Sequence, residues 1–121
     1  MSSNIRTAAE AAAHRVEERW GSLTWLAGRG IGNAQGLTLG RVVIRRGMSN
    51  PRHSHPNCEE ALYLLRGRLR HTMGDAQVVL EPGDTLVLDA GVPHNATSIG
   101  EEDAEMVVAY SSGDRGFRTE P

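Results

Sequence analysis

The chain has 121 residues, a mass of 13.1 kDa and a formal net charge of −2 at pH 7, which indicates a single domain and excludes a strongly basic protein. Nucleic acid and anionic membranes are therefore not expected partners. Aromatic residues make up only 4%, so we expect an aliphatic core and no stacking platform for single-stranded nucleic acid. All 13 basic residues are arginine, which excludes chemistry that needs a lysine amine.

The cysteine count and the first residues predict the compartment. Cys58 is the only cysteine, so the chain cannot form an internal disulfide. Polar residues such as Arg6 and Glu10 stand where a secretory signal is apolar, and no apolar run is long enough to cross a bilayer. The sequence predicts a soluble, cytoplasmic protein.

The first 21 residues have the features of a helix. Thr7 and Glu10 have the spacing of a capping box, in which two side chains satisfy the first free amides of a helix. The residues that follow are rich in Ala, Arg and Glu, which are good helix formers. We expect one N-terminal helix that continues as far as Trp20 and Gly21.

The chain beyond Gly21 has the pattern of a β protein. Short runs rich in Val, Leu and Ile are separated by Gly, Pro, Asp or Asn about every 8–12 residues, which is typical of an all-β sandwich or barrel. We expect residues 22–112 to form the domain and residues 113–121 to be a polar, loosely packed tail. The expected strands are Thr24–Ala27, Leu37–Arg46, Glu59–Arg66, Arg68–Met73, Gln77–Leu80, Thr85–Leu88, His94–Ser98 and Ala104–Tyr110.

Two turns between these strands have a clear mechanism. Gly74-Asp75 is a two-residue hairpin signal, because glycine can supply the positive φ that such a turn needs. Pro82-Gly83 fits the central positions of a type II turn. Both turns join neighbouring antiparallel strands.

Three of the five histidines lie in two segments that glycines frame. His53 and His55 are two residues apart, so on a strand both side chains lie on one face, and Glu60 follows shortly after. The first segment reads Gly47-x5-His53-x-His55-x4-Glu60-x6-Gly67, and the second reads Gly83-x5-Asp89-x-Gly91-x2-His94-x3-Ser98.

This arrangement resembles the two motifs of the cupin superfamily, Gly-x5-His-x-His-x3,4-Glu-x6-Gly and Gly-x5-Pro-x-Gly-x2-His-x3-Asn. Asp89 and Ser98 depart from the second motif, at positions that do not bind metal in the family. Fifteen residues separate the motifs, which is similar to a small single-domain bacterial cupin of the germin-like type. The resemblance implies an all-β, double-stranded β-helix (jelly-roll) barrel.

The resemblance also implies a metal centre. The family's ligands correspond to His53, His55, Glu60 and His94, with Glu59 as the alternative carboxylate. Three imidazoles and one carboxylate suit one divalent transition metal per chain, either Fe, Mn, Ni, Cu or Zn, and leave two positions of an octahedral ion open. A family member of this size also commonly forms a homodimer.

Four further residues are candidates for the pocket. His71 can serve as an acid or base, although a histidine that faces solvent or packs in the core is the alternative. Tyr63 and Arg41 can contact a substrate if their strands turn them inward. Cys58 is either a reactive or ligating thiol or, more simply, a small buried residue.

These features lead to two hypotheses about function. The first is a metal-dependent enzyme that acts on a small oxygenated metabolite, with a dioxygenase ahead of an isomerase, lyase or decarboxylase. The second is a non-catalytic module that binds or senses a small carboxylate or sugar. An internal acid or base near the metal favours the first hypothesis, and a purely apolar pocket favours the second.

Overall fold

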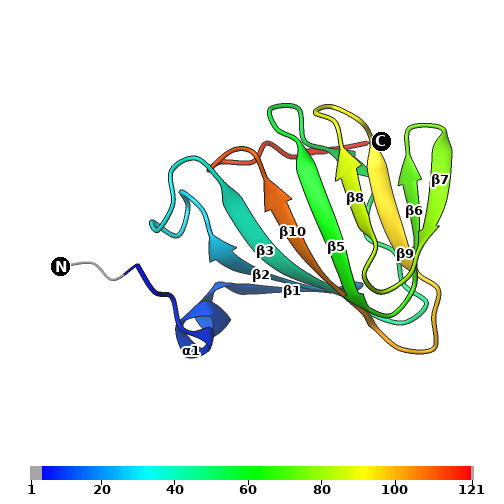
Figure 1. Cartoon of the computed structure of the whole chain (residues 1–121), viewed down its shortest axis with the longest axis horizontal. Helices are drawn as coiled ribbons and strands as arrows, with labels where there is room; N and C mark the ends of the chain where they lie inside the picture. The colour runs from blue at the N-terminus through cyan, green and yellow to red at the C-terminus, as the bar shows by residue number, and fades with distance from the viewer. Residues whose placement is uncertain (1–3, 121) are drawn as a thin grey trace.

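The computed structural model describes residues 4–120 and arranges their strands in two antiparallel sheets, which face each other across the core (Figure 1). This confirms the predicted jelly-roll barrel. The first sheet has, in order across it, β1 (Arg15–Glu18), β2 (Gly21–Ala27), β3 (Thr38–Ile44), β10 (Ala104–Tyr110), β5 (Glu60–Arg66) and β8 (Thr85–Leu88). The second has β11 (Arg118–Thr119), β4 (His53–Ser54), β9 (His94–Ser98), β6 (Leu69–Met73) and β7 (Ala76–Leu80).

Alternation along the strands decides which side chains enter the barrel. In β5, Glu60, Leu62 and Leu64 are buried, whereas Tyr63 and Leu65 between and beside them are exposed. The period of two is the reason, since successive side chains of a strand point to opposite faces. The core is aliphatic, as the composition predicts, and its most deeply buried members are Ile44, Leu64, Leu69, Ala104 and Met106.

The turns explain why the sequence needs glycine at fixed positions. Gly74 has a φ of +59° between the paired residues Met73 and Ala76, which confirms the two-residue hairpin. The Asp84 amide donates to the Glu81 carbonyl at 3.0 Å around Gly83, which confirms the type II turn. At Gly67 the φ is +86°, and a Cβ there would lie 2.6 Å from the Cα of Ala104 in the facing segment.

The N-terminal helix is much shorter than predicted. The capping box of Thr7 and Glu10 is present, but α1 covers only Ala8–Ala11, and a 3-10 turn at Ala12–His14 follows it. Residues 15–18 are β1, which pairs with β2, so the prediction of a helix up to Gly21 is wrong. Pairing with the edge of a sheet has outweighed helix propensity here, because a helix of this length has little stability of its own. In Figure 1, α1 lies outside the sheets at the lower left.

The C-terminal segment, residues 111–120, packs on the barrel, although we predicted a loosely packed tail. It crosses the upper end of the barrel from β10 toward β9 (Figure 1). Its strand β11 pairs with β4, and Arg52 forms an ion pair with Glu120. Backbone hydrogen bonds and charge hold this segment. A search for apolar periodicity cannot detect such a segment.

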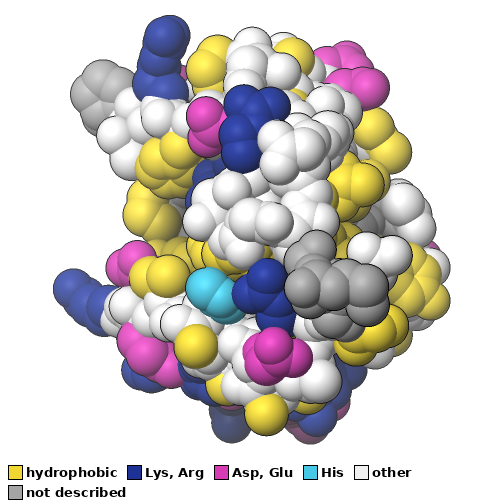
Figure 2. Space-filling view, turned by 90° about the vertical axis from the view of Figure 1, so that its left-hand side faces the viewer, with side chains coloured by type: hydrophobic (Ala, Val, Ile, Leu, Met, Phe, Trp, Pro, Cys, Tyr) yellow, Lys and Arg dark blue, Asp and Glu magenta, His cyan; other side chains and the backbone are white. Residues whose placement is uncertain are grey.

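The surface seen in Figure 2 mixes both signs of charge with hydrophobic side chains, and no broad patch of one sign appears on that face. None of the helices within residues 4–120 has the length and apolar character to cross a bilayer.

Candidate metal centre

Three buried histidines converge inside the barrel. His53 and His94 are paired residues of β4 and β9, and His55 follows the end of β4. Their ring centroids are 4.4 Å (His53–His94), 4.9 Å (His53–His55) and 5.2 Å (His55–His94) apart. One nitrogen from each ring lies within 4.8 Å of the other two, so this group can hold a metal ion.

The backbone fixes the tautomer of all three rings. Each Nδ1 lies within hydrogen-bond distance of a carbonyl oxygen, and because a carbonyl can only accept, each Nδ1 carries the proton. Each Nε2 therefore has a free lone pair, which is the usual arrangement of a metal-binding histidine. The three pairs are His53 Nδ1 to Pro51 O at 2.7 Å, His55 Nδ1 to Gly116 O at 2.7 Å, and His94 Nδ1 to Val92 O at 2.9 Å.

Glu60 completes the cluster. Its Oε1 lies 3.2 Å from the Nε2 of His55 and 3.2 Å from the Nε2 of His94. These three atoms are buried and have no hydrogen-bond partner among the described residues. Burial raises the pKa of Glu60, and positive charge at the His55 and His94 rings lowers it by more, to about 2, so a cation held at these rings keeps the group a carboxylate at neutral pH. Three lone-pair atoms that face one another in this way need a cation between them.

An imidazole that binds a metal must be neutral, and His53 meets this requirement. Burial is the main influence and lowers the pKa of His53 from 6.5 to about 4.

Glu59, the alternative carboxylate, is exposed, because it precedes the first inward position of β5. The geometry thus favours Glu60 over Glu59 as the carboxylate of the cluster.

The cluster lies in a pocket of about 380 Å³, a size that suits a small molecule. His53, Glu60, His94 and His71 form part of its polar lining, and Glu18, Asn50, Arg115 and Thr119 complete it. Most of the remaining wall is apolar or aromatic, and it includes Trp25, Val42, Leu62, Met106 and Phe117.

The family model described as "Cupin domain" matches residues 40–110, which is more than half of the chain. The chain belongs to the cupin family. This cupin is 33% identical to germin-like protein 3-8 from Oryza sativa subsp. japonica over 85 residues, which are 66% of the chain and 38% of that relative. It is 29% identical to oxalate oxidase 1 from Hordeum vulgare over 93 residues, which are 70% of the chain and 46% of that relative. The chain thus spans less than half the length of these relatives.

Solved structures share the fold of this cupin. An oxalate decarboxylase from Lactobacillus farciminis, in a formate complex, matches with a TM-score of 0.80 and 19% identity over 87% of the chain and 32% of that protein. An uncharacterized protein with a double-stranded β-helix domain from Klebsiella pneumoniae matches with a TM-score of 0.78 and 19% identity, over 99% of the chain and all of that protein (100%). At this level of identity the likeness concerns the fold.

The other predicted pocket residues divide into two groups. His71 is buried, lines the pocket and stacks on His94 with ring centroids 5.7 Å apart. Tyr63 and Arg41 do not line it: Tyr63 is 46% exposed, and Arg41 forms an ion pair with Glu105 on the outer face. Strand alternation turns both outward, so neither is positioned to contact a substrate in this pocket.

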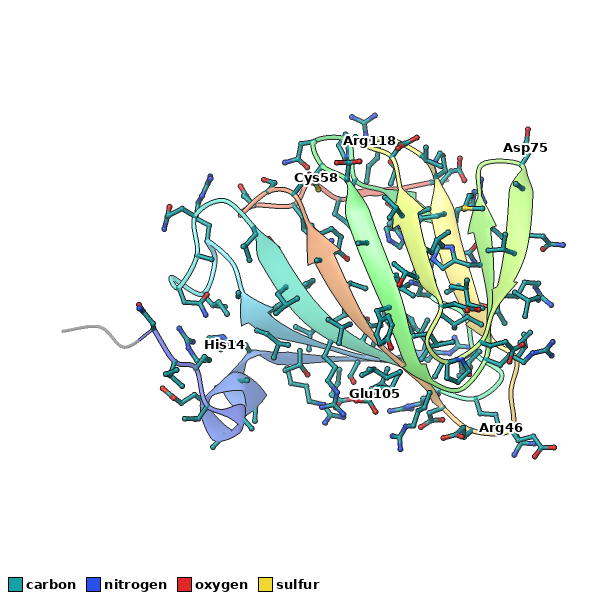
Figure 3. All side chains as sticks on the ribbon, in the orientation of Figure 1. His14, Arg46, Cys58, Asp75, Glu105 and Arg118 are labelled. Carbon is teal, nitrogen blue, oxygen red and sulfur yellow. The ribbon has the colours of Figure 1, made fainter. Side chains whose placement is uncertain are left out.

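Cys58 belongs to the hydrophobic core of this cupin, as its alternative interpretation predicts. Burial raises the pKa of the thiol, so it is protonated and unreactive at neutral pH. Figure 3 shows it at the upper end of the barrel, where the C-terminal segment passes.

The contribution of the C-terminal segment to the centre was not predicted from the sequence. Phe117 stacks on His53 with centroids 4.9 Å apart and an interplanar angle of 24°, and Gly116 O holds the Nδ1 proton of His55. One signal was available: Phe117 is the only phenylalanine of the chain, and it stands within the polar tail.

Proposed function

We propose that this cupin is a metal-dependent enzyme that acts on a small oxygenated metabolite, most simply as a dioxygenase. The proposal depends on one observation above all: the unprotonated Nε2 atoms of the three histidines and a buried carboxylate converge at one point of a mostly apolar pocket. His53, His55, His94 and Glu60 would hold the ion. Three neutral nitrogens and one carboxylate oxygen fit a divalent ion of Fe, Mn, Ni, Cu or Zn.

When bound, such an ion polarises a carbonyl or enolate oxygen and, as iron(II), supports reactions with dioxygen. The chain itself supplies two further functions. The apolar wall limits the contact of the reacting groups with water. His71 donates its Nδ1 proton to Thr72 O at 2.9 Å, so its Nε2 carries a lone pair that can accept a proton from a substrate in the pocket.

The relatives support the class of substrate. The names oxalate oxidase and oxalate decarboxylase both refer to reactions of a small oxygenated acid. The chain spans less than half of the oxalate oxidase and about a third of the oxalate decarboxylase, so we do not assign oxalate as the substrate of this cupin.

The apolar wall of the pocket favours a second candidate, a non-catalytic module that binds a small carboxylate or sugar at the same metal. The two candidates differ in His71, since a module of this kind needs no internal base. The variant His71→Gln should abolish turnover and leave binding intact if the protein is an enzyme, and should have little effect on a binding module.

The experiment that tests the enzyme begins with metal content. Elemental analysis should find about one equivalent of a transition metal in the wild type, almost none in His94→Ala, and the wild-type amount in His14→Ala, whose ring lies outside the pocket. The loaded protein is then supplied with small diketones, phenols and hydroxy acids while dioxygen uptake and CO₂ release are recorded. Uptake without hydrogen peroxide identifies a dioxygenase, uptake with hydrogen peroxide identifies an oxidase, and CO₂ release without uptake identifies a decarboxylase. Unchanged metal content in His94→Ala contradicts the site.

We also infer a homodimer. In support, Tyr63, Leu65 and Val87 expose apolar surface on β5 and on β8, the strand at one edge of the first sheet. Burial of such a face and edge is favourable. Light scattering after size exclusion should give about twice the mass of one chain, and Val87→Glu should shift the protein toward the monomer.

A further inference from the structure

Arg115 stands over three aromatic rings at the metal pocket. Its guanidinium carbon is 4.5 Å from the ring centroid of Trp25, 5.4 Å from that of Tyr110 and 5.3 Å from that of Phe117. Trp25, Tyr110 and Phe117 all line the pocket together with Arg115, which also borders a smaller hollow beside Gly28. Stacking of this kind holds the planar guanidinium by its faces and leaves its N–H edge free.

The Arg115 side chain has no hydrogen-bond or ion-pair partner within residues 4–120, and its burial sets it apart from the other arginines without such a partner. Six arginines pair with glutamates: Arg15, Arg41, Arg45, Arg52, Arg66 and Arg68. The other described arginines without a side-chain partner are all exposed, namely Arg19, Arg46, Arg70 and Arg118. Arg115 is half-buried, so its charge is partly withdrawn from water without an anion to compensate it.

The backbone on both sides of Arg115 is fixed by one side chain. Asn57 Nδ2 donates to Asp114 O at 2.8 Å, and Gly116 N donates to Asn57 Oδ1 at 2.6 Å. Gly116 also accepts from His55, a predicted metal ligand. The guanidinium is therefore held in place before any ligand arrives, and this reduces the entropy that a ligand must overcome.

Charge and distance indicate what Arg115 faces. Phe117 neighbours both the guanidinium and His53, since its ring is 5.3 Å from the first and 4.9 Å from the second. Among the acidic residues of the described chain, only Glu18 and Glu60 line the pocket, and neither pairs with Arg115. With a divalent ion bound, the cations of the pocket exceed its buried carboxylate, so the pocket favours an anion.

We propose that Arg115 is the substrate-binding residue that selects a carboxylate: it holds the outer carboxylate of a small dicarboxylic acid whose inner oxygens reach the metal centre. A guanidinium edge matches a carboxylate through two parallel hydrogen bonds. The proposal rests on the proposed function, because it assigns the second end of the same substrate.

The experiment measures binding and requires no turnover. The protein loaded with Mn(II) is titrated by calorimetry with oxalate, malonate, succinate, glutarate and adipate, and with the monoamide of each acid. The wild type should bind at least one diacid more tightly than its monoamide. Arg115→Gln should weaken that diacid about 10–100-fold and weaken the monoamide by less. Arg115→Lys should retain part of the affinity, since the charge remains but the paired hydrogen bonds do not.

The matched control is Arg118→Gln, which removes an exposed arginine of the same segment that lies outside the pocket (Figure 3). It should bind all ligands as the wild type does. Equal affinity of the wild type for every diacid and its monoamide overturns the proposal, as does full affinity in Arg115→Gln. If the wild type takes up none of Mn, Fe, Ni, Cu or Zn, the proposed function fails. In that case, loss of diacid binding in Arg115→Gln but not in Arg118→Gln, both measured without metal, still supports Arg115 as the residue that binds a carboxylate.

Discussion

Asn57 connects the C-terminal segment to the metal centre, and its removal should affect stability and metal affinity together. Its amide group forms one hydrogen bond to Asp114 and one to Gly116. Gly116 in turn holds the Nδ1 proton of His55. In Asn57→Ala both bonds are lost, so the carbonyl that orients His55 is no longer held in place.

The magnitude follows from the number of bonds. Two neutral hydrogen bonds are worth about 1–3 kcal/mol together, and because Asn57 is exposed, water replaces part of each. We expect the metal-free protein to lose about 1–2 kcal/mol of unfolding free energy. Loss of a partner that orients a metal-binding histidine costs about 10–100-fold in metal affinity. We expect the lower end of that range, since the rest of the segment remains paired through β11.

The control is Asn33→Ala. Asn33 also bridges two backbone groups, since Gly28 N donates to its Oδ1 and its Nδ2 donates to Leu26 O, each at 3.0 Å. It does so in the loop between β2 and β3, and Asn33 does not line the metal pocket. The loss of stability should therefore be similar in both variants, while only Asn57→Ala loses metal affinity.

Urea unfolding of the metal-free proteins gives the two free energies, and competition with a chelator gives the two metal affinities. Equal metal affinity in the two variants would refute the role of Asn57 in orienting His55. A large loss of stability in Asn33→Ala combined with none in Asn57→Ala would refute the contribution of the C-terminal segment to the fold.

Three further changes test the site and its frame. Glu60→Gln should weaken metal binding at least 10-fold more than Glu59→Gln, since only Glu60 faces the histidines, and chelator competition would reveal the opposite order. The free energy of unfolding of the metal-free protein should be about 2 kcal/mol lower at about pH 5 than at about pH 7.5. The reason is His53, whose pKa is 6.5 in the unfolded chain and about 4 in the folded chain. The contribution of His53 to stability is thus complete above pH 6.5 and decreases as the pH is lowered. Urea unfolding at both pH values measures this decrease. Gly67→Ala should lower the free energy of unfolding by about 3 kcal/mol, since a Cβ at position 67 would meet the facing backbone. Gly74→Ala should lower it by about 1 kcal/mol, since a Cβ at position 74 would meet open space. Equal melting temperatures of the two variants contradict this difference.

Most strands were predictable because they have a buried face of regular period, as β3, β9 and β10 do. All eight strands predicted between residues 24 and 110 are present, and three of them, such as β9 at His94–Ser98, have the predicted bounds. The glycine frame was predictable for a similar reason. Gly47, Gly67, Gly83 and Gly91 all have a positive φ, which few other residues adopt without strain.

The remaining features depend on contacts between distant residues. Arg41 and Tyr63 were predicted as possible pocket residues, but they occupy the outward-facing positions of β3 and β5, where burial alternates along the strand. The hydrogen bond from His55 to Gly116 spans 61 residues, and nothing near either residue indicates it. The local sequence around His53, His55 and His94 therefore identified the cluster, but not the segment that orients it.

The position of Gly116 has a consequence for biosynthesis. A ribosome makes the chain from the N-terminus, so β2 to β10 and all three histidines are synthesised before the carbonyl that orients His55. The barrel can pair its central strands during translation, while the centre gains its full geometry only after the C-terminal segment has left the exit tunnel and crossed the barrel. The centre should therefore reach its full metal affinity only after this segment has crossed the barrel, and a nascent chain stalled before residue 116 should bind metal more weakly than the released chain.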